Sequence, residues 1–461
     1  MGLIPKRGLT IGIVAATLLG TSALGAAPPA SGTAPPGPVA PPAAVAPPAV
    51  GPGPATPSAV TALLSVASDG AHGNADSFAP SLSADGSTVG FASLATNFSA
   101  REAVQVVNVF VRDQRTGRTE RISEGFGGTD TDGDSKNPSL SADGSVVAFE
   151  SSASNLVPGD SNGASDVFVR DRRDGRTTLV SVDSAGNAGN EGSFTPSISA
   201  DGRYVAFASD ATALVPGDHN RAEDVFVHDR RTGQTVKVSE ASDGRPGNGN
   251  SYSPAISADG RFVAFASEAT NLVRGDTNGA TDIFVHDLAT GRTVRVSVAS
   301  NGAQSDGDAF TPSISGDGRY VAFISDAGNL RSGDGNRASD VFVHDGETGR
   351  TVLVSRSPDP DVSFDRGSFE PSLSVDGRYV AFVTDGALVP EDTNNTEDVY
   401  LAEVSGRGVR RVSLASDGSS GNGPSLSPSV NGDGNVVAFE SLASNLVVAD
   451  SNGADDVFWR R

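Results

Sequence analysis

The chain repeats one unit of about 58 residues, and this repetition restricts its fold more than any other feature of the sequence. The phrase Ser-x-Ser-x-Asp-Gly recurs with its aspartate at Asp85, Asp143, Asp201, Asp259, Asp317 and Asp376, and a seventh copy at Asp433 has Asn431 in place of the second serine. A second phrase, Asp-Val-Phe-Val-x-Asp, is clearest at 166–171, 224–229 and 340–345. Repeats of this length build arrays of one supersecondary unit, so the whole chain has to be interpreted as copies of that unit.

Each copy contains four short β-strand signals. In the fourth copy we expect strands at 252–257, 261–267, 282–286 and 293–298, with tight turns at Asp259-Gly260 and Thr290-Gly291. Glycine supplies the positive φ that a primed hairpin turn requires. Four antiparallel strands per unit describe a propeller blade. The sequence therefore predicts an all-β, seven-bladed β-propeller.

The two ends of the array predict how the ring closes. The seventh copy reaches Arg461 just after its third strand signal and has no fourth. Residues 61–67 (TALLSVA) match the fourth-strand pattern of residues 293–299 (TVRVSVA). We therefore expect the N-terminal strand to complete the last blade, which removes the open sheet edges of the ring.

The repeat resembles a known family. The unit Pro-Ser-Leu/Ile-Ser-x-Asp-Gly-Arg-Tyr/Phe-Val-Ala-Phe, followed by Asp-Val/Ile-Phe-Val-x-Asp-x-x-Thr-Gly-x-Thr, is similar to the WD40-like repeats of TolB-like propellers and covers residues 61–461. The resemblance implies the propeller fold. It leaves the function open, because such repeats occur in periplasmic scaffolds and are also attached to peptidases.

The N-terminus resembles an export signal. Lys6 and Arg7 precede an apolar stretch and then a group of small residues, as signal peptidase requires, so residues 1–26 are expected to be a signal peptide. An uncleaved membrane anchor is the alternative; if the signal is cleaved, the mature chain has no transmembrane span. Residues 27–60 are rich in Pro and Ala and are expected to form an extended linker before the propeller at 61–461. We expect a secreted, periplasmic or cell-surface protein.

Composition excludes several classes of partner and site. Asp and Glu number 56 against 34 Lys and Arg, which gives a net charge of −22. Such a chain is a poor partner for nucleic acid, whose phosphates require clustered basic residues. Cysteine is absent, which rules out disulfides and thiolate chemistry within the chain. We expect a monomer whose partner is an unknown protein or glycan.

The loop between the second and third strands carries a repeated set of oxygen side chains. The candidate metal ligands are Asp160, Asn162 and Asp166; Asp218, Asn220 and Asp224; Asp276, Asn278 and Asp282; Asp334, Asn336 and Asp340; Asp392, Asn394 and Asp398; and Asp450, Asn452 and Asp456. Hard oxygens at this spacing, with glycine nearby, resemble the start of calcium loops. The alternative is a structural Asx turn, in which Asp and Asn bind local backbone N–H groups. Calcium is therefore a possible cofactor, and both interpretations stay open.

Signals of catalysis are weak, and we assign no catalytic residue. His228, His286 and His344 share one register of the repeat, where we expect a surface position at a strand end rather than a catalyst. The first hypothesis is an exported, non-enzymatic binding scaffold that interacts with a protein or ligand. The alternatives are a calcium-stabilised surface or adhesive protein and a carbohydrate-active hydrolase or lyase.

Overall fold

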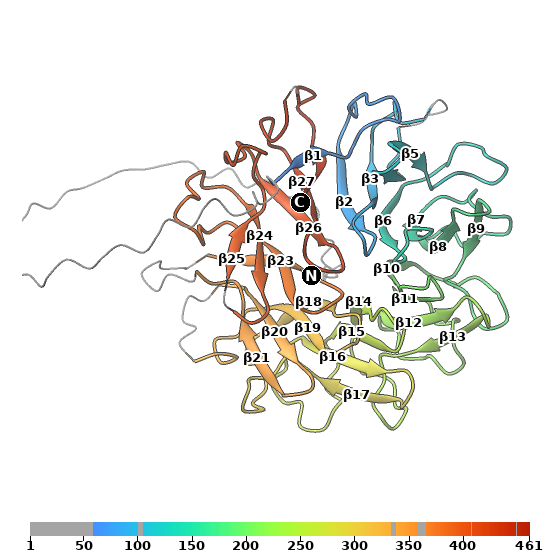
Figure 1. Cartoon of the computed structure of the whole chain (residues 1–461). Helices are drawn as coiled ribbons and strands as arrows, with labels where there is room; N and C mark the ends of the chain where they lie inside the picture. The colour runs from blue at the N-terminus through green and yellow to red at the C-terminus, as the bar shows by residue number, and fades with distance from the viewer. Residues whose placement is uncertain (1–58, 100–104, 333–337, 358–365, 407, 449) are drawn as a thin grey trace, which may run out of the picture. The chain divides into compact units, whose positions relative to one another are not determined.

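The computed structural model describes residues 59–99, 105–332, 338–357, 366–406, 408–448 and 450–461, which form seven four-stranded antiparallel sheets arranged as a β-propeller (Figure 1). The predicted signal peptide (1–26) and residues 27–58 of the predicted linker lie outside the described residues. Within the described part, no helix has the length and apolar character needed to cross a bilayer. The fold class predicted from the sequence is confirmed.

The blades follow the chain order, with the innermost strand first. Blade 1 contains β2 (Ser77–Leu82), β3 (Thr88–Ser93), β4 (Asn108–Asp113) and β5 (Arg118–Arg121). Blade 2 contains β6 (Ser135–Leu140), β7 (Val146–Ser151), β8 (Asp166–Asp171) and β9 (Arg176–Leu179). Blade 3 contains β10 (Ser193–Ile198), β11 (Tyr204–Ser209), β12 (Asp224–Asp229) and β13 (Gln234–Lys237). Blade 4 contains β14 (Ser251–Ile256), β15 (Phe262–Ser267), β16 (Asp282–Asp287) and β17 (Arg292–Arg295).

The remaining blades repeat this order. Blade 5 contains β18 (Ala309–Ile314), β19 (Tyr320–Ser325), β20 (Asp340–Asp345) and β21 (Arg350–Leu353). Blade 6 contains β22 (Ser368–Leu373), β23 (Tyr379–Thr384), β24 (Asp398–Glu403) and β25 (Val409–Arg411). Blade 7 contains β26 (Ser425–Val430), β27 (Val437–Ser441) and β28 (Asp456–Arg460), and its fourth strand is β1 (Thr61–Leu63).

The N-terminal strand closes the ring as predicted. β1 pairs antiparallel with β28, with Thr61 opposite Arg460. Arg460 also donates hydrogen bonds to the carbonyls of Leu414 and Ala415 in the loop that follows blade 6. This closure joins the first and last strands of the chain into one sheet.

The hydrophobic core lies between neighbouring sheets. Each described blade stacks two aromatic rings from its second and third strands, such as Phe265 and Phe284, whose centroids are 5.9 Å apart. The second strands are buried on both faces; β15, for example, is buried from Val263 to Ser267. Burial on both faces explains why these strands have the nearly continuous apolar sequence Val-Ala-Phe.

The Asp-Gly turns place glycine where the sequence requires it, but the turn type differs from our prediction. Gly260 has φ of 74°, whereas Asp259 is absent from the residues with positive φ. A type I′ turn needs positive φ at both central residues and a type II′ turn at the first; neither Ala258 nor Asp259 has positive φ, so the predicted primed turn is wrong. The Gly260 N–H binds the Ser257 carbonyl, as in a type I turn followed by a left-handed glycine. A Cβ at Gly260 would also lie 2.2 Å from the Tyr204 ring of blade 3.

These turns define one side of the propeller, which we call the tight-turn side; the longer connections lie on the other side, the long-loop side. On the tight-turn side, seven backbone hydrogen bonds link each innermost turn to the next around the whole ring. They run through Ala84, Ala142, Ala200, Ala258, Gly316, Val375–Asp376 and Gly432. The small residues allow this close approach, and Gly316 leaves the space that Val375 fills, because a Cβ there would lie 2.5 Å from Val375 Cγ1.

Candidate functional site

The predicted oxygen ligands lie on the long-loop side, and the last aspartate of each set begins the third strand of its blade. These aspartates are completely or almost completely buried: Asp166, Asp224, Asp282, Asp340, Asp398 and Asp456. Asp334 and Asn336 of blade 5 lie outside the described residues. In the other sets the structure brings together the residues that the repeat predicted.

Each buried aspartate binds a serine that stands two residues after the end of the outermost strand. In blade 3, the Ser239 hydroxyl donates to Asp224 Oδ1 at 2.6 Å, and the Val225 N–H donates to the same hydroxyl. The corresponding serines donate to Asp166, Asp282, Asp340, Asp398 and Asp456. The aspartate therefore fixes the outermost strand to the third strand, which is a structural role.

The asparagine of the motif also has structural partners. In blade 3, Asn220 Nδ2 donates to Asp224 Oδ2 at 2.8 Å and to the Gly247 carbonyl at 3.2 Å. Its Oδ1 accepts the Ala222 N–H, which forms an Asx turn. The asparagines at 162, 278 and 452 bind in the same way. The side-chain oxygen that calcium would need is thus already used within the loop.

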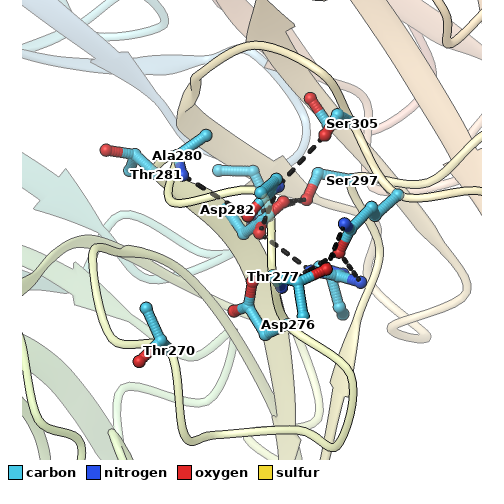
Figure 2. Close-up of polar contacts among 12 residues, drawn as sticks. Thr270, Asp276, Thr277, Ala280, Thr281, Asp282, Ser297 and Ser305 are labelled. Atoms are coloured by element: carbon cyan, nitrogen blue, oxygen red, sulfur yellow. Dashed lines mark hydrogen bonds and ion pairs between the residues drawn. The ribbon is translucent and has the colours of Figure 1, made fainter.

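In three blades a basic side chain of the chain itself lies between the two aspartates. Lys237 Nζ is 3.2 Å from Asp218 Oδ1 and 2.6 Å from Asp224 Oδ2. Arg295 and Arg411 make the same bridge to Asp276 and Asp282, and to Asp392 and Asp398. Figure 2 shows Asp276 and Asp282 together with Ser297 in blade 4. A calcium ion in these blades would compete with a buried basic side chain for the same carboxylates.

At the position where blades 3, 4 and 6 have this basic residue, blade 2 has Leu179 and blade 7 has Leu63. No basic side chain forms an ion pair with Asp160 or Asp450 among the described residues. Burial and the nearby charges of Asp166 and Asp132 raise the pKa of Asp160 to about 6. In blade 7, the positive charge of His72 partly offsets the effect of burial on the pKa of Asp450. The same aspartate pair is therefore neutralised internally in some blades and not in others.

Our sequence analysis missed this basic residue. It stands 13 positions after the last aspartate of the motif in blades 3, 4 and 6. Its alternation with leucine between copies was visible in the sequence, but its contact with the loop depends on the pairing of the third and fourth strands. Within the described residues, no group of three or more His, Asp or Glu side chains is arranged to hold a metal ion.

A second set of carboxylates lies between neighbouring blades near the innermost strands. Glu440 Oε2 accepts the Ala79 N–H at 2.7 Å, and Glu150 and Glu370 accept the N–H groups of Thr195 and Ser427. The three donors have φ between 48° and 51°, a conformation that L-residues rarely adopt. Each glutamate therefore stabilises a strained residue before a proline in the next blade.

The long-loop side also concentrates acids that lack neutralisation. Burial, together with the charges of Glu440, Asp76 and Asp456, raises the pKa of Asp455 to about 8. Burial and the charges of Asp210, Glu268 and Asp224 raise the pKa of Glu223 to about 7. Raised pKa values with carboxylates among their causes indicate a negative local potential.

On the tight-turn side, several arginines are paired with aspartates. Arg203 binds Asp229 through two hydrogen bonds of 2.8 and 2.6 Å, and Arg261 and Arg319 repeat this contact with Asp287 and Asp345. The hydrogen bonds from Arg203 are the main reason why the pKa of Asp229 is low. The negative local potential therefore belongs to the long-loop side.

The recurring histidines are buried, which corrects our expectation of a surface position. His228, His286 and His344 are at most 6% exposed. The Nδ1 of each lies 2.9–3.0 Å from a threonine hydroxyl of the outermost strand. Burial lowers their pKa values, so they are neutral at pH 7. Their role is to join the third and fourth strands.

Comparisons with known proteins show the fold. No family model and no curated protein matches the sequence. The β-propeller domain of the Trilobed protease from Pyrococcus furiosus, described as having an open velcro topology, is 10% identical and aligns with 84% of this chain and 94% of its own at a TM-score of 0.51. TolB from Acinetobacter baumannii is 15% identical, with 72% of this chain covered and a TM-score of 0.39, and this chain spans 62% of its length. An oligogalacturonate lyase from Vibrio parahaemolyticus is 14% identical, with 84% and 89% covered and a TM-score of 0.48. The fold implied by the TolB-like repeat is confirmed, and in this chain the ring is closed by β1 and β28.

Proposed function

We propose that this chain is a non-enzymatic binding scaffold that is exported to the bacterial envelope or outside the cell, and that it engages a protein or glycan partner through its long-loop side. The observation that carries the proposal is the electrostatic difference between the two sides. Three arginines of the tight-turn side bind aspartates on the same side, whereas on the long-loop side burial and neighbouring carboxylates raise the pKa values of Glu223 and Asp455. Such a face attracts cationic groups of a partner.

The tight-turn side offers less for recognition. Its innermost turns are bonded to one another around the ring through small residues, and Arg203, Arg261 and Arg319 already bind aspartates of the same side. A partner would have to break those ion pairs to form its own. Propellers commonly bind through the loops of one side, and the long-loop side is the one with unsatisfied charge.

The experiment is a cross-linking capture from envelope fractions and a glycan array with the full chain, at low and high salt. The test variant combines Asp210→Asn with Glu268→Gln, two exposed acids beside Glu223. The matched control combines Asp174→Asn with Glu347→Gln, two exposed acids on the tight-turn side. We expect a salt-sensitive partner that the control retains and the test variant loses. Equal loss in both variants would contradict the proposal.

A carbohydrate-active hydrolase or lyase is the second candidate, because two neighbouring carboxyl groups have raised pKa values. Burial raises the pKa of Glu440 to about 7 and that of Asp455 to about 8, so a protonated acid lies beside a second carboxyl group near neutral pH. We favour the scaffold because Glu440 makes the same bond as Glu150 and Glu370 and is explained by that structural role. Release of reducing or unsaturated sugars from the array glycans, lost in Asp455→Asn, would favour the enzyme.

A further inference from the structure

A cavity of about 700 Å³ lies between blades 1 and 2, along the outer edge of β9. Its walls are the loop from Glu124 to Gly128, the loop from Leu156 to Asp160, Arg170 and residues 175–179 of blade 2, and Val182, Gly186 and Ala188 in the loop that follows blade 2. This volume is within the range of ligand sites in proteins. The cavity lies away from the innermost strands, and Asp160 is the one acid discussed above that lines it.

The cavity exists because a contact that recurs elsewhere in the ring is missing here. At five other junctions a serine hydroxyl of the blade-to-blade loop accepts the N–H of a residue in the outermost strand of the next blade. The pairs are Ser68–Thr119, Ser184–Thr235, Ser242–Thr293, Ser300–Thr351 and Ser416–Thr61. In the loop between blades 1 and 2 that register is occupied by Phe126, which is 65% exposed. Thr177 is accordingly partly exposed, while the threonines at 119, 235, 293 and 351 are buried.

The missing contact leaves a strand edge open. The N–H groups of the other threonines point away from their own sheet towards the serine, so the Thr177 N–H points into the cavity. β9 is the outermost strand of its sheet, and an extended peptide can add to such an edge by backbone hydrogen bonds. Phe126 offers an aromatic surface beside this edge, a residue type enriched at protein interfaces.

The long-loop end of the cavity carries a charge that selects the side chain of such a peptide. Asp160 and Leu179 both line it, and Asp166 lies near Asp160. The other lining carboxylate, Glu124, is already paired with Arg170 at 2.9 Å. In blades 3, 4 and 6 the positions equivalent to Asp160 and Asp166 bind Lys237, Arg295 or Arg411, which stand in the place of Leu179. The equivalent aspartate pairs of blades 3, 4 and 6 thus each bind an ammonium or guanidinium group.

We propose that the cavity binds an extended segment of a partner protein, whose backbone pairs with the open edge of β9 and whose lysine or arginine side chain supplies to Asp160 the positive charge that blade 2 lacks. This inference rests on the proposed binding function and names the chemistry of one partner and its site. The length of β9, four residues, limits the paired part of the peptide to a short segment.

The key variant is Leu179→Lys, which gives blade 2 the basic side chain that blade 3 has at this position. The new lysine would pair with Asp160 and Asp166 and so take the place of the peptide's basic side chain. The matched control is Leu63→Lys, the same substitution at the equivalent position of blade 7, far from the cavity. A phage library of random 12-residue peptides is selected on the full wild-type chain, with counter-selection on Leu179→Lys. Enriched peptides are then measured by fluorescence anisotropy, each beside a version with glutamine in place of its basic residue. Thermal melts check that every variant is folded.

We expect enriched peptides to contain a lysine or arginine among β-branched or apolar residues. Their affinity should fall at least tenfold with glutamine, with Asp160→Asn and with Leu179→Lys, and should stay unchanged with Leu63→Lys. Phe126→Ser, which restores the serine of the other junctions, should also weaken binding. No enrichment over the counter-selection, enriched peptides without a basic residue, or equal binding to Leu179→Lys would overturn the proposal. A rise in Tm with millimolar calcium that Asp160→Asn abolishes would also overturn it, because a metal ion would then be the cation.

The peptide-binding test can succeed or fail independently of the capture experiment that tests the scaffold proposal. A partner that is captured by the wild type and by Leu179→Lys, but not by the Asp210→Asn, Glu268→Gln variant, would support the scaffold and place its binding outside this cavity. Selected peptides whose affinity falls with Asp160→Asn would support binding in the cavity, whether or not the Asp210→Asn, Glu268→Gln variant still captures a partner.

Discussion

Lys237, Arg295 and Arg411 each neutralise two buried aspartates of their own blade. Their side chains are at most 10% exposed, and the aspartates they bind are buried as deeply. Removing one member of such a group leaves a buried charge without compensation, which costs more than the intact group contributes. The identity of one side chain in the outermost strand therefore decides whether the aspartate pair of a blade is neutralised from within that blade.

Lys237→Met should lower the free energy of unfolding by about 3–5 kcal/mol at pH 7, because Asp218 and Asp224 lose their shared positive charge. Urea unfolding measures this difference. Leu179→Met, at the equivalent position of blade 2, is the matched control and should cost less than about 1.5 kcal/mol. A cost for Lys237→Met no larger than that of the control would show that the bridge carries no net stability.

At the scale of the strand and loop, the serine contact between blades holds each outermost strand from outside its own sheet. In blade 4 the Thr293 N–H donates to Ser242 Oγ at 2.9 Å, and the Thr293 hydroxyl donates to the Glu240 carbonyl. The outermost strands are short, with three or four residues each, and have one neighbouring strand. These contacts compensate for the missing neighbour.

Ser242→Ala should lower the free energy of unfolding by about 1 kcal/mol, the usual contribution of one hydrogen bond. It should also speed amide hydrogen exchange at Thr293 and its neighbours in β17, since the N–H loses its acceptor. Asp243→Ala, the adjacent exposed residue, serves as control and should change stability by less than about 0.5 kcal/mol. Unchanged exchange in β17 with Ser242→Ala would contradict this role.

The strands and loops also show which features could be predicted from the sequence and which could not. The repeat predicted the strands of blade 4 to within about three residues and predicted the pairing of β1 with the last blade, because both follow from spacing and pattern. It did not reveal the bridge made by Lys237 or the cavity beside Phe126, because both depend on contacts between strands or blades. The burial of His228 was missed for the same reason: its partner Thr235 lies on the neighbouring strand.

At the scale of the whole molecule, the long-loop side gives the protein an unusual dependence on pH. The pKa values of Glu223, Glu440, Asp455 and Asp160 lie between about 6 and 8 in the folded state, above the ordinary values of 3.8 for Asp and 4.5 for Glu. The folded state therefore binds more protons than the unfolded state between about pH 4 and pH 8. Stability falls as pH rises wherever this is the case.

We expect Tm to decrease as the pH is raised from 6 to 9, because these carboxyl groups lose their protons in the folded protein. Asp455→Asn removes the group with the highest of these pKa values. It should therefore raise Tm at pH 8 and make the decrease of Tm between pH 6 and pH 9 smaller. Asp174→Asn, an exposed aspartate on the tight-turn side, should leave the profile unchanged. A Tm that rises between pH 6 and pH 9 would contradict the predicted protonation.

The pairing of β1 with β28 also determines how the ring responds to force. Val60 and Arg461 exchange two backbone hydrogen bonds, so both strands of the closure can be pulled from the same end. A load applied between the two ends of the propeller would break these bonds one after another, as in unzipping, rather than load them together in shear. The closure that removes the open edges is thus its mechanically weakest seam, and pulling on the ends should first release β1 and leave the other six blades intact.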